Sequence, residues 1–100
     1  METIILDTNR LIDGERGTVT MFSLIEYPPA LPECEILFPV DDDFRLALHL
    51  SVKLRTIGTP IPAVDILIAS MAINRNYPLK TTDKDFFAIQ RVDQRLRLLI

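Results

Sequence analysis

Four acidic residues stand where an expected strand ends or an expected helix begins. They are Asp7, Glu26, Asp65 and Asp83. The first and the last of them follow the strand-like runs 4–6 and 78–82, and the other two fall in the first turn of expected helices. In a right-handed parallel sheet, the carboxyl ends of the strands and the N-termini of the following helices share one edge. We therefore expect the four carboxylates to face one cleft.

A cluster of four carboxylates is expected to bind a cation that offsets their repulsion. Each close pair of carboxylates near a protein surface repels by about 4 kcal/mol, and a helix N-terminus stabilises an anion by only about 0.3–1 kcal/mol. Cys34 is the only cysteine and His49 the only histidine, which excludes an intramolecular disulfide and a multi-cysteine zinc site. The remaining donors are hard oxygens, which favour Mg²⁺ or Mn²⁺.

Each acid also has a structural interpretation. Asp7 could cap the first helix, and Asp83 could cap the turn that follows it. Glu26 lies three residues after Ser23, which is the spacing of a capping box. Asp65 is harder to explain in this way, because it is the only charge in an apolar helix and a buried carboxylate needs a partner.

The elements that position these residues alternate along the chain. Strands are expected at 4–6, 19–22, 35–40, 78–82 and 96–100. Helices are expected at 11–15, from Ser23 to the prolines that follow, from Asp41 to Gly58, from Pro62 to about 73, and at 83–89. This alternation predicts an α/β fold, a three-layer α/β/α sandwich with a mainly parallel central sheet.

The long helix beginning at 41–43 carries apolar residues at three- and four-residue spacing. We expect Phe44 and Leu48 from this helix, and Ile68 from the next one, to lie in the core. The three aspartates 41–43 are interpreted as capping residues and solvated charge rather than metal ligands.

Length and composition fit one globular domain, 1–100. The chain has 48% hydrophobic and 25% charged residues, which excludes a disordered protein. Its longest nearly apolar run, 61–73, is too short to span a bilayer and contains an acid, so we expect a cytoplasmic protein without a membrane partner. Residues 1–44 hold 2 basic and 10 acidic side chains, whereas 45–100 hold 9 and 4. The basic second half could therefore meet phosphates.

Four short motifs occur in order along the chain: ILDTN at 5–9, SLIE at 23–26, RTIGTPIPAVDILIASMA at 55–72 and LKTTDKDF at 79–86. Together they resemble PIN-domain proteins, in particular VapC-type toxins. The resemblance covers nearly the whole chain. One departure is that such proteins usually carry a helical hairpin after the second acid, where this chain has the short proline-rich connection 27–33.

The resemblance implies a PIN-like sandwich, a divalent-metal-dependent ribonuclease cleft, a VapB-type antitoxin as inhibitor and often a homodimer. It assigns the roles of catalytic and metal-binding acids to Asp7, Glu26, Asp65 and Asp83. It adds Thr8 and Asn9 as substrate-binding residues, and Thr81 and Asp85 as auxiliary residues.

We therefore expect Mg²⁺- or Mn²⁺-dependent hydrolysis of RNA, in which metal-activated water attacks the phosphorus. Three acids, Asp7, Asp65 and Asp83, would hold one or two ions, and Glu26 would act as a ligand or accept a hydrogen bond from water. Candidates to hold the RNA backbone are Lys53, Arg55, Arg75, Lys80, Lys84 and Arg91.

Two other classes of function remain open. The first is a catalytically impaired PIN-fold binding module that acts through protein partners, because the connection 27–33 is short. The second is a phosphoacceptor signalling domain, which also clusters acids on a parallel sheet. The resemblance disfavours this second alternative, because an early pair of aspartates and a lysine after the last core strand are not placed as that chemistry requires.

Overall fold

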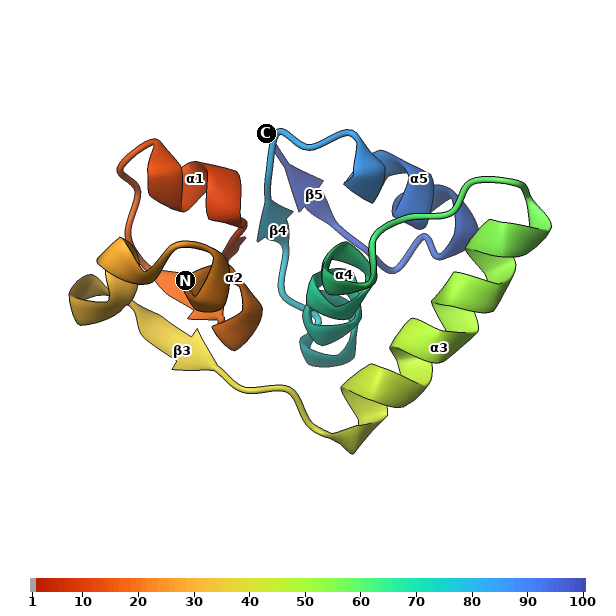
Figure 1. Cartoon of the computed structure of the whole chain (residues 1–100), viewed down its shortest axis with the longest axis horizontal. Helices are drawn as coiled ribbons and strands as arrows, with labels where there is room; N and C mark the ends of the chain where they lie inside the picture. The colour runs from red at the N-terminus through yellow and green to blue at the C-terminus, as the bar shows by residue number, and fades with distance from the viewer. Residues whose placement is uncertain (1) are drawn as a thin grey trace.

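A parallel sheet forms the centre of the computed structural model, which describes residues 2–100 (Figure 1). In this part of the chain the sheet has five strands, in the order β3-β2-β1-β4-β5. Their bounds are β1 Ile5–Leu6, β2 Thr18–Thr20, β3 Glu35–Leu37, β4 Leu79–Lys80 and β5 Leu98–Leu99. Every neighbouring pair runs parallel, so the predicted parallel sheet is confirmed.

The helices lie on both faces of this sheet. They are α1 Thr8–Ile12, α2 Met21–Glu26, the 3-10 helix η1 Pro28–Glu33, α3 Asp41–Thr56, α4 Ala63–Arg75 and α5 Asp85–Val92. The chain moves outward from β1 to β3, and then returns through α3 and α4 to β4 on the other side of β1. Right-handed crossovers then place α1, α2 and η1 on one face and α3, α4 and α5 on the other. The α/β/α sandwich is confirmed.

Alternate residues of the strands feed two separate cores, as the two-residue period of a strand requires. Ile5 belongs to the larger core, which it shares with α3, α4 and α5, including the fully buried Leu50 and Ile68. Leu6 points the other way and packs in the smaller core with Leu11 of α1, Leu24 of α2 and Ala30 of η1. Each helical layer is thereby fixed to the sheet independently.

The start of α2 differs from the expectation. Thr20 rather than Ser23 caps the helix: the Thr20 side chain accepts a hydrogen bond from the backbone N of Ser23 at 3.3 Å. The Ser23 hydroxyl is buried without a hydrogen-bond partner among the described residues. The predicted Ser23–Glu26 capping box is therefore wrong, and Glu26 lies at the end of α2 rather than in its first turn.

The outer side of α3 also departs from the expectation. Ile68 is fully buried as predicted, but Phe44 is 49% and Leu48 69% exposed. The prediction that these two lie in the core is wrong, because the face of α3 turned to the core carries Ala47, Leu50 and Leu54 instead. The apolar side chains of α3 therefore spread over a wider part of its surface than the part that packs against the rest of the protein.

The first turn of α3 is anchored by one of its aspartates. Asp41 and Asp42 are exposed, as expected of solvated charge. Asp43 is fully buried, so the interpretation as solvated charge is wrong for this residue. Its Oδ2 accepts a hydrogen bond from the backbone N of Val40 at 2.8 Å, which is the capping contact, and its other partners lie on α4.

Candidate metal centre

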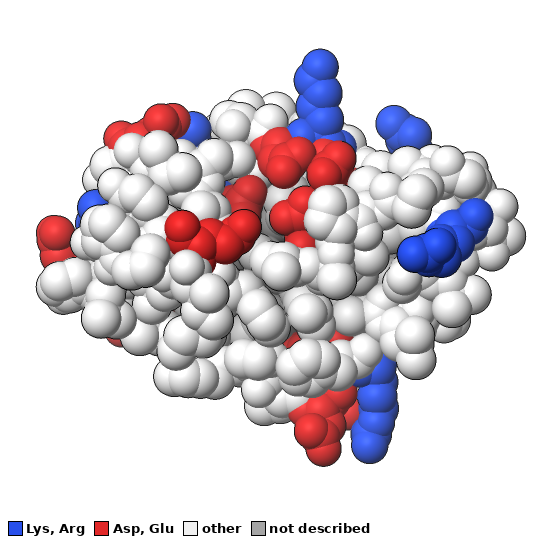
Figure 2. Space-filling model, in the orientation of Figure 1, with Lys and Arg blue, Asp and Glu red and all other residues white. Residues whose placement is uncertain are grey.

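The acidic residues meet where the strand order reverses, between β1 and β4. In open α/β sheets this switch point opens a crevice beyond the carboxyl ends of the strands. Asp7 directly follows β1 and Thr81 directly follows β4, while Asp65 lies in the first turn of α4. Figure 2 shows acidic side chains gathered near the centre of this face of the molecule. The predicted convergence on one edge of the sheet is therefore present.

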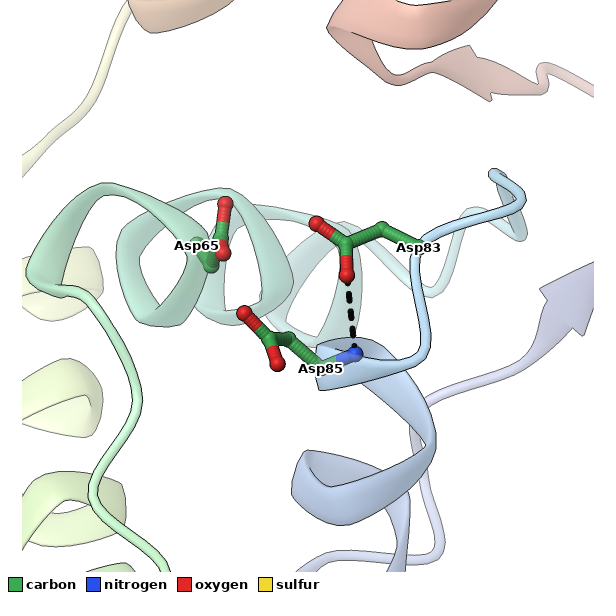
Figure 3. Close-up of side chains that lie close together, drawn as sticks. All are labelled: Asp65, Asp83 and Asp85. Atoms are coloured by element: carbon green, nitrogen blue, oxygen red, sulfur yellow. Dashed lines mark hydrogen bonds between the residues drawn. The ribbon is translucent and has the colours of Figure 1, made fainter.

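Three of the acids form a tight group. One carboxylate oxygen each of Asp65, Asp83 and Asp85 lies within 4.8 Å of the others. Figure 3 shows Asp65 on α4, Asp83 on the turn before α5 and Asp85 at the start of α5, with the three side chains directed toward one another. Asp83 Oδ1 also accepts a hydrogen bond from the backbone N of Asp85 at 2.9 Å. Asp83 thus fixes this turn, as its structural interpretation proposed, and faces Asp65 as well.

Asp7 lies beside this group and is held by a threonine. Its side chain is buried, and its Oδ2 accepts hydrogen bonds from Thr81 Oγ1 at 2.8 Å and from Asn9 Nδ2 at 3.3 Å. The same Thr81 oxygen accepts hydrogen bonds from the backbone N of Asp83 at 3.0 Å and from Asn9 Nδ2 at 3.2 Å. Thr81 therefore links the acid that follows β1 to the acid that follows β4.

Glu26 borders the site from α2. Its Oε1 accepts a hydrogen bond from Thr8 Oγ1 at 2.8 Å, and its side chain is exposed. The predicted substrate-binding pair, Thr8 and Asn9, thus contacts the acids themselves, and its role toward substrate stays a prediction. Of the four predicted acids, Asp65 and Asp83 belong to the tight group, and Asp7 and Glu26 surround it.

The electrostatics of the group follow from burial and from like charge. Burial, and then repulsion from Asp83, Asp7 and Asp85, raise the pKa of Asp65 from 3.8 to about 7. Burial also raises the pKa of Asp7, with a further contribution from the charges of Asp83 and Glu26, although the hydrogen bond from Thr81 opposes the shift. The charged forms of these carboxylates repel one another, so without a bound cation Asp65 and Asp7 hold their protons to a higher pH than usual.

The donor set fits a hard divalent cation. Among residues 2–100, the ion pairs with lysine or arginine involve other acids, and Asp65, Asp83 and Asp85 take part in none of them. Three carboxylates from different segments can offer oxygens to one ion, which is the ligand type that Mg²⁺ and Mn²⁺ prefer. The residues present therefore fit the predicted metal.

One further residue at the site, Arg10, was not among the residues predicted from the sequence. Arg10 Nε donates to Asn9 Oδ1 at 3.1 Å, which turns the amide nitrogen of Asn9 toward Asp7 and Thr81. Arg10 is itself held by Glu15, at 3.3 Å, and by Asp13. It follows the ILDTN motif directly, but nothing in its spacing distinguishes it from a surface arginine.

The fold is shared with chains of several bacterial toxin-antitoxin complexes. DNA-bound VapBC from Salmonella typhimurium contains a chain that is 19% identical, with a TM-score of 0.80 and coverage of 99% of this chain and 98% of that one. A chain of VapBC-5 from Mycobacterium tuberculosis is 21% identical, with a TM-score of 0.77 and coverage of 99% of this chain and 98% of that one. A chain of VapBC-1 from nontypeable Haemophilus influenzae is 19% identical, with a TM-score of 0.78 and coverage of 97% of this chain and 96% of that one. No protein-family model matches the sequence, and no curated protein sequence matches it. At these identities the likeness establishes the fold alone.

Within residues 2–100, no helix combines the length and the apolar character needed to cross a bilayer.

Proposed function

We propose that this protein is a Mg²⁺- or Mn²⁺-dependent ribonuclease that hydrolyses RNA phosphodiester bonds and acts as the toxin of a toxin-antitoxin pair. The observation that carries the proposal is the group of Asp65, Asp83 and Asp85 at the switch point of the sheet, next to Asp7. The raised pKa of Asp65 supports it, because a carboxylate at this position is stabilised by a bound cation.

In this proposal Asp7, Asp65 and Asp83 hold the metal, as expected from the sequence, and Asp85 joins them as a further ligand. A bound divalent ion would supply Lewis acidity toward the phosphate and would acidify water. Asp7 keeps its position through Thr81 and Asn9. Glu26, held by Thr8, presents an exposed carboxylate that can accept a proton or a hydrogen bond from the attacking water.

The contacts narrow the set of basic residues that could hold the RNA backbone. Arg75 is committed to Asp43, and Lys80 Nζ donates to Glu15 at 2.6 Å. The other four candidates are exposed: Lys53, Arg55, Lys84 and Arg91. Lys84 stands between Asp83 and Asp85 in the chain and is the nearest in sequence to the proposed metal. We therefore assign a phosphate contact to Lys84 first, with a salt-dependent effect on binding.

The toxin assignment rests on the shared fold together with the motifs. The compared structures are of VapBC proteins, which form a family of toxin-antitoxin systems. We extend this to the present chain as a proposal: a VapB-type antitoxin would bind it and block the cleft. On this proposal, induction of the chain alone arrests growth of a bacterial host, and Asp7→Asn relieves the arrest.

A second candidate function is a PIN-fold binding module without catalysis. The short connection after α2 folds as η1, and beside it lies an apolar groove of about 340 Å³ lined by Met21, Leu24, Ile25, Pro28 and Leu31. Ile25 is 68% exposed and directly precedes Glu26. A protein partner seated in this groove would reach the acidic site, and this favours binding as the alternative.

An RNA cleavage assay separates the two functions. Purified protein is incubated with single-stranded RNA in Mg²⁺, in Mn²⁺ and in EDTA, beside Asp7→Asn and the control Asp42→Asn, an exposed acid on α3. We expect cleavage only with metal, its loss in Asp7→Asn and its retention in the control. Metal-independent cleavage, or equal cleavage by Asp7→Asn, would contradict the ribonuclease proposal. A folded protein that cleaves nothing under any condition would favour the binding module.

A further inference from the structure

Two phenylalanines follow each other in the first turn of α5 and have different surroundings. Phe86 is fully buried and belongs to the larger core. Phe87 is partly exposed, and within residues 2–100 it is not among the partly buried side chains that pack against either core. The motif LKTTDKDF, which carries the resemblance at this place, ends at Phe86, so the resemblance assigns no role to Phe87. Core packing accounts for the first ring but not for the second.

Two cations flank the second ring on the same face of the helix. Lys84 precedes Phe87 by three residues, and Arg91 follows it by four. Residues at these spacings are neighbours on the surface of a helix, and the backbone is already helical at Lys84. Seven residues of helix place the two cations about 10 Å apart along the axis, with the ring between them. We call these three residues the α5 face.

The two cations of the α5 face have no acidic partner. In the described part of the chain, the ion pairs formed by lysine and arginine involve other residues, whereas Lys84 and Arg91 are exposed and take part in none of them. Exposed cations beside an accessible aromatic ring are typical of surfaces that bind single-stranded nucleic acid, because the cations contact phosphates and the ring stacks on a base.

The α5 face begins at the acidic group. Lys84 stands in the chain between Asp83 and Asp85, two of the three acids that come together. Figure 1 shows α5 leading away from β4 and from this turn. An RNA strand with one phosphate at Lys84 therefore has its next bases within reach of Phe87, one helical turn further on. In duplex RNA the faces of the bases are stacked on one another, so only an unpaired base can lie on the ring.

We propose that Phe87 is a substrate-contacting residue on which one unpaired base of the RNA stacks, while Lys84 and Arg91 hold phosphates on either side of it. The inference rests on the proposed ribonuclease function. It adds to that function a substrate class, RNA that is single-stranded next to the cleaved bond, and a residue that selects this class. The alternative role of Phe87 is structural, with its ring supporting the guanidinium of Arg91 through a cation–π contact.

RNA binding by Phe87→Leu tests the stacking contact, because leucine keeps an apolar side chain but removes the ring. Fluorescence anisotropy in Mg²⁺ gives the Kd for a labelled single-stranded RNA and for a duplex of the same sequence, in an Asp7→Asn parent that does not cleave. Phe87→Leu should weaken single-strand binding about tenfold and leave duplex binding within about twofold of the parent. Phe87→Trp should bind the single strand at least as tightly as the parent. The matched control is Phe44→Leu, the same change at an exposed phenylalanine of α3, which should bind both RNAs as the parent does.

The salt dependence of binding separates stacking from the structural role. If the base stacks on the ring, Phe87→Leu keeps the slope of log Kd against log salt, because the phosphate contacts remain, whereas Arg91→Gln lowers this slope by about one. If the ring only supports Arg91, Phe87→Leu lowers the slope as Arg91→Gln does and weakens the single strand and the duplex equally. Circular dichroism checks that each variant is folded.

The outcomes distinguish this inference from the function on which it rests. Cleavage of RNA by a protein whose single-strand binding is the same in Phe87→Leu would overturn the stacking contact alone. Equal weakening of single-strand and duplex binding, or a lowered slope in Phe87→Leu, would also overturn it. Single-strand binding that depends on Phe87, in a protein that cleaves no RNA with any metal, would support the contact and overturn only the ribonuclease activity.

Discussion

Two aspartates occupy the same position on neighbouring helices. Asp43 is the third residue of α3 and Asp65 the third residue of α4, and these helices pack against each other. The Asp43 carboxylate accepts four hydrogen bonds: from Val40 N at 2.8 Å, from Asn74 Nδ2 at 2.9 Å, and from the two terminal nitrogens of Arg75 at 3.0 and 3.1 Å. Asp65 faces two other carboxylates instead.

The two environments move the pKa values in opposite directions. Burial acts to raise the pKa of Asp43, but the hydrogen bonds from Arg75, Val40 and Asn74 outweigh burial and hold it below its usual range. Burial and like charge raise the pKa of Asp65 to about 7. The chain therefore supplies its own cation to Asp43 and leaves Asp65 without one. Position in a helix does not distinguish a structural acid from a functional one, whereas the partner does.

The largest effect is expected from removing the charge of Asp65. Asp65→Asn should lower RNA cleavage about a thousandfold or more, which corresponds to about 4 kcal/mol of transition-state stabilisation. The same variant should be more stable than the wild type in EDTA, because it relieves the repulsion among the acids. A gain of about 1 kcal/mol would raise the melting temperature by about 4–8 °C in a domain of this size. A fall in melting temperature would show that Asp65 has a structural partner.

The opposite behaviour is expected at Asp43. Asp43→Asn leaves the guanidinium of Arg75 without its carboxylate, and breaking a buried pair of this kind costs about 3–5 kcal/mol. Chemical denaturation measures this loss in the free energy of unfolding. The neighbouring Asp42→Asn is the control, because its pair with Arg45 is exposed and should contribute less than about 1 kcal/mol. Comparable losses in the two variants would remove the distinction between the sites.

The pH dependence of stability should show both environments. Between about pH 4 and pH 7 the folded protein holds a proton on Asp65 that the unfolded chain has lost, so stability without metal should fall as the pH rises through this window. The lowered pKa of Asp43 stabilises the fold above about pH 4, and this contribution is lost only below that value. In EDTA we therefore expect a higher melting temperature at about pH 5.5 than at about pH 8.

Two controls sharpen this measurement. Asp65→Asn should flatten the dependence between pH 5.5 and pH 8, because the titrating group is gone. Mg²⁺ should raise the melting temperature more at the higher pH, since metal binding requires deprotonated ligands. A wild-type protein that becomes more stable with rising pH in EDTA would rule out a proton on Asp65.

The sequence predicted that the acids converge on one edge of the sheet, but it did not predict which residues each acid contacts. Asp7 could be placed because a β-branched apolar run ends immediately before it, and Asp65 because no other charge interrupts its helix. Asp85 was placed only as an auxiliary acid, since its closeness to Asp65 depends on how the turn after β4 is folded. The partners of Asp43 lie on α4, about thirty residues away in the chain, and spacing along one helix carries no information on such contacts.

The errors in the fold have similar causes. Thr20 rather than Ser23 caps α2, because β2 ends at Thr20 and the helix begins at the next residue. The periodicity of α3 showed that one face is apolar but not how much of this face the sheet and α4 would cover. Phe44 and Leu48 fall on the uncovered part, which only the packing of the whole chain could reveal.

The smallest effect is expected from a change at Arg10. Arg75 contacts Asp43 directly, whereas Arg10 reaches Asp7 only through Asn9. Arg10 holds the amide of Asn9, and Asn9 holds Asp7. Arg10→Gln should lower kcat about tenfold, or about 1.4 kcal/mol, with KM nearly unchanged, because Asn9 can then turn its amide away. Arg95→Gln, which removes a surface pair with Asp93, is the control. A rise in KM with unchanged kcat would show instead that Arg10 contacts the RNA directly, since only uniform binding would then be lost.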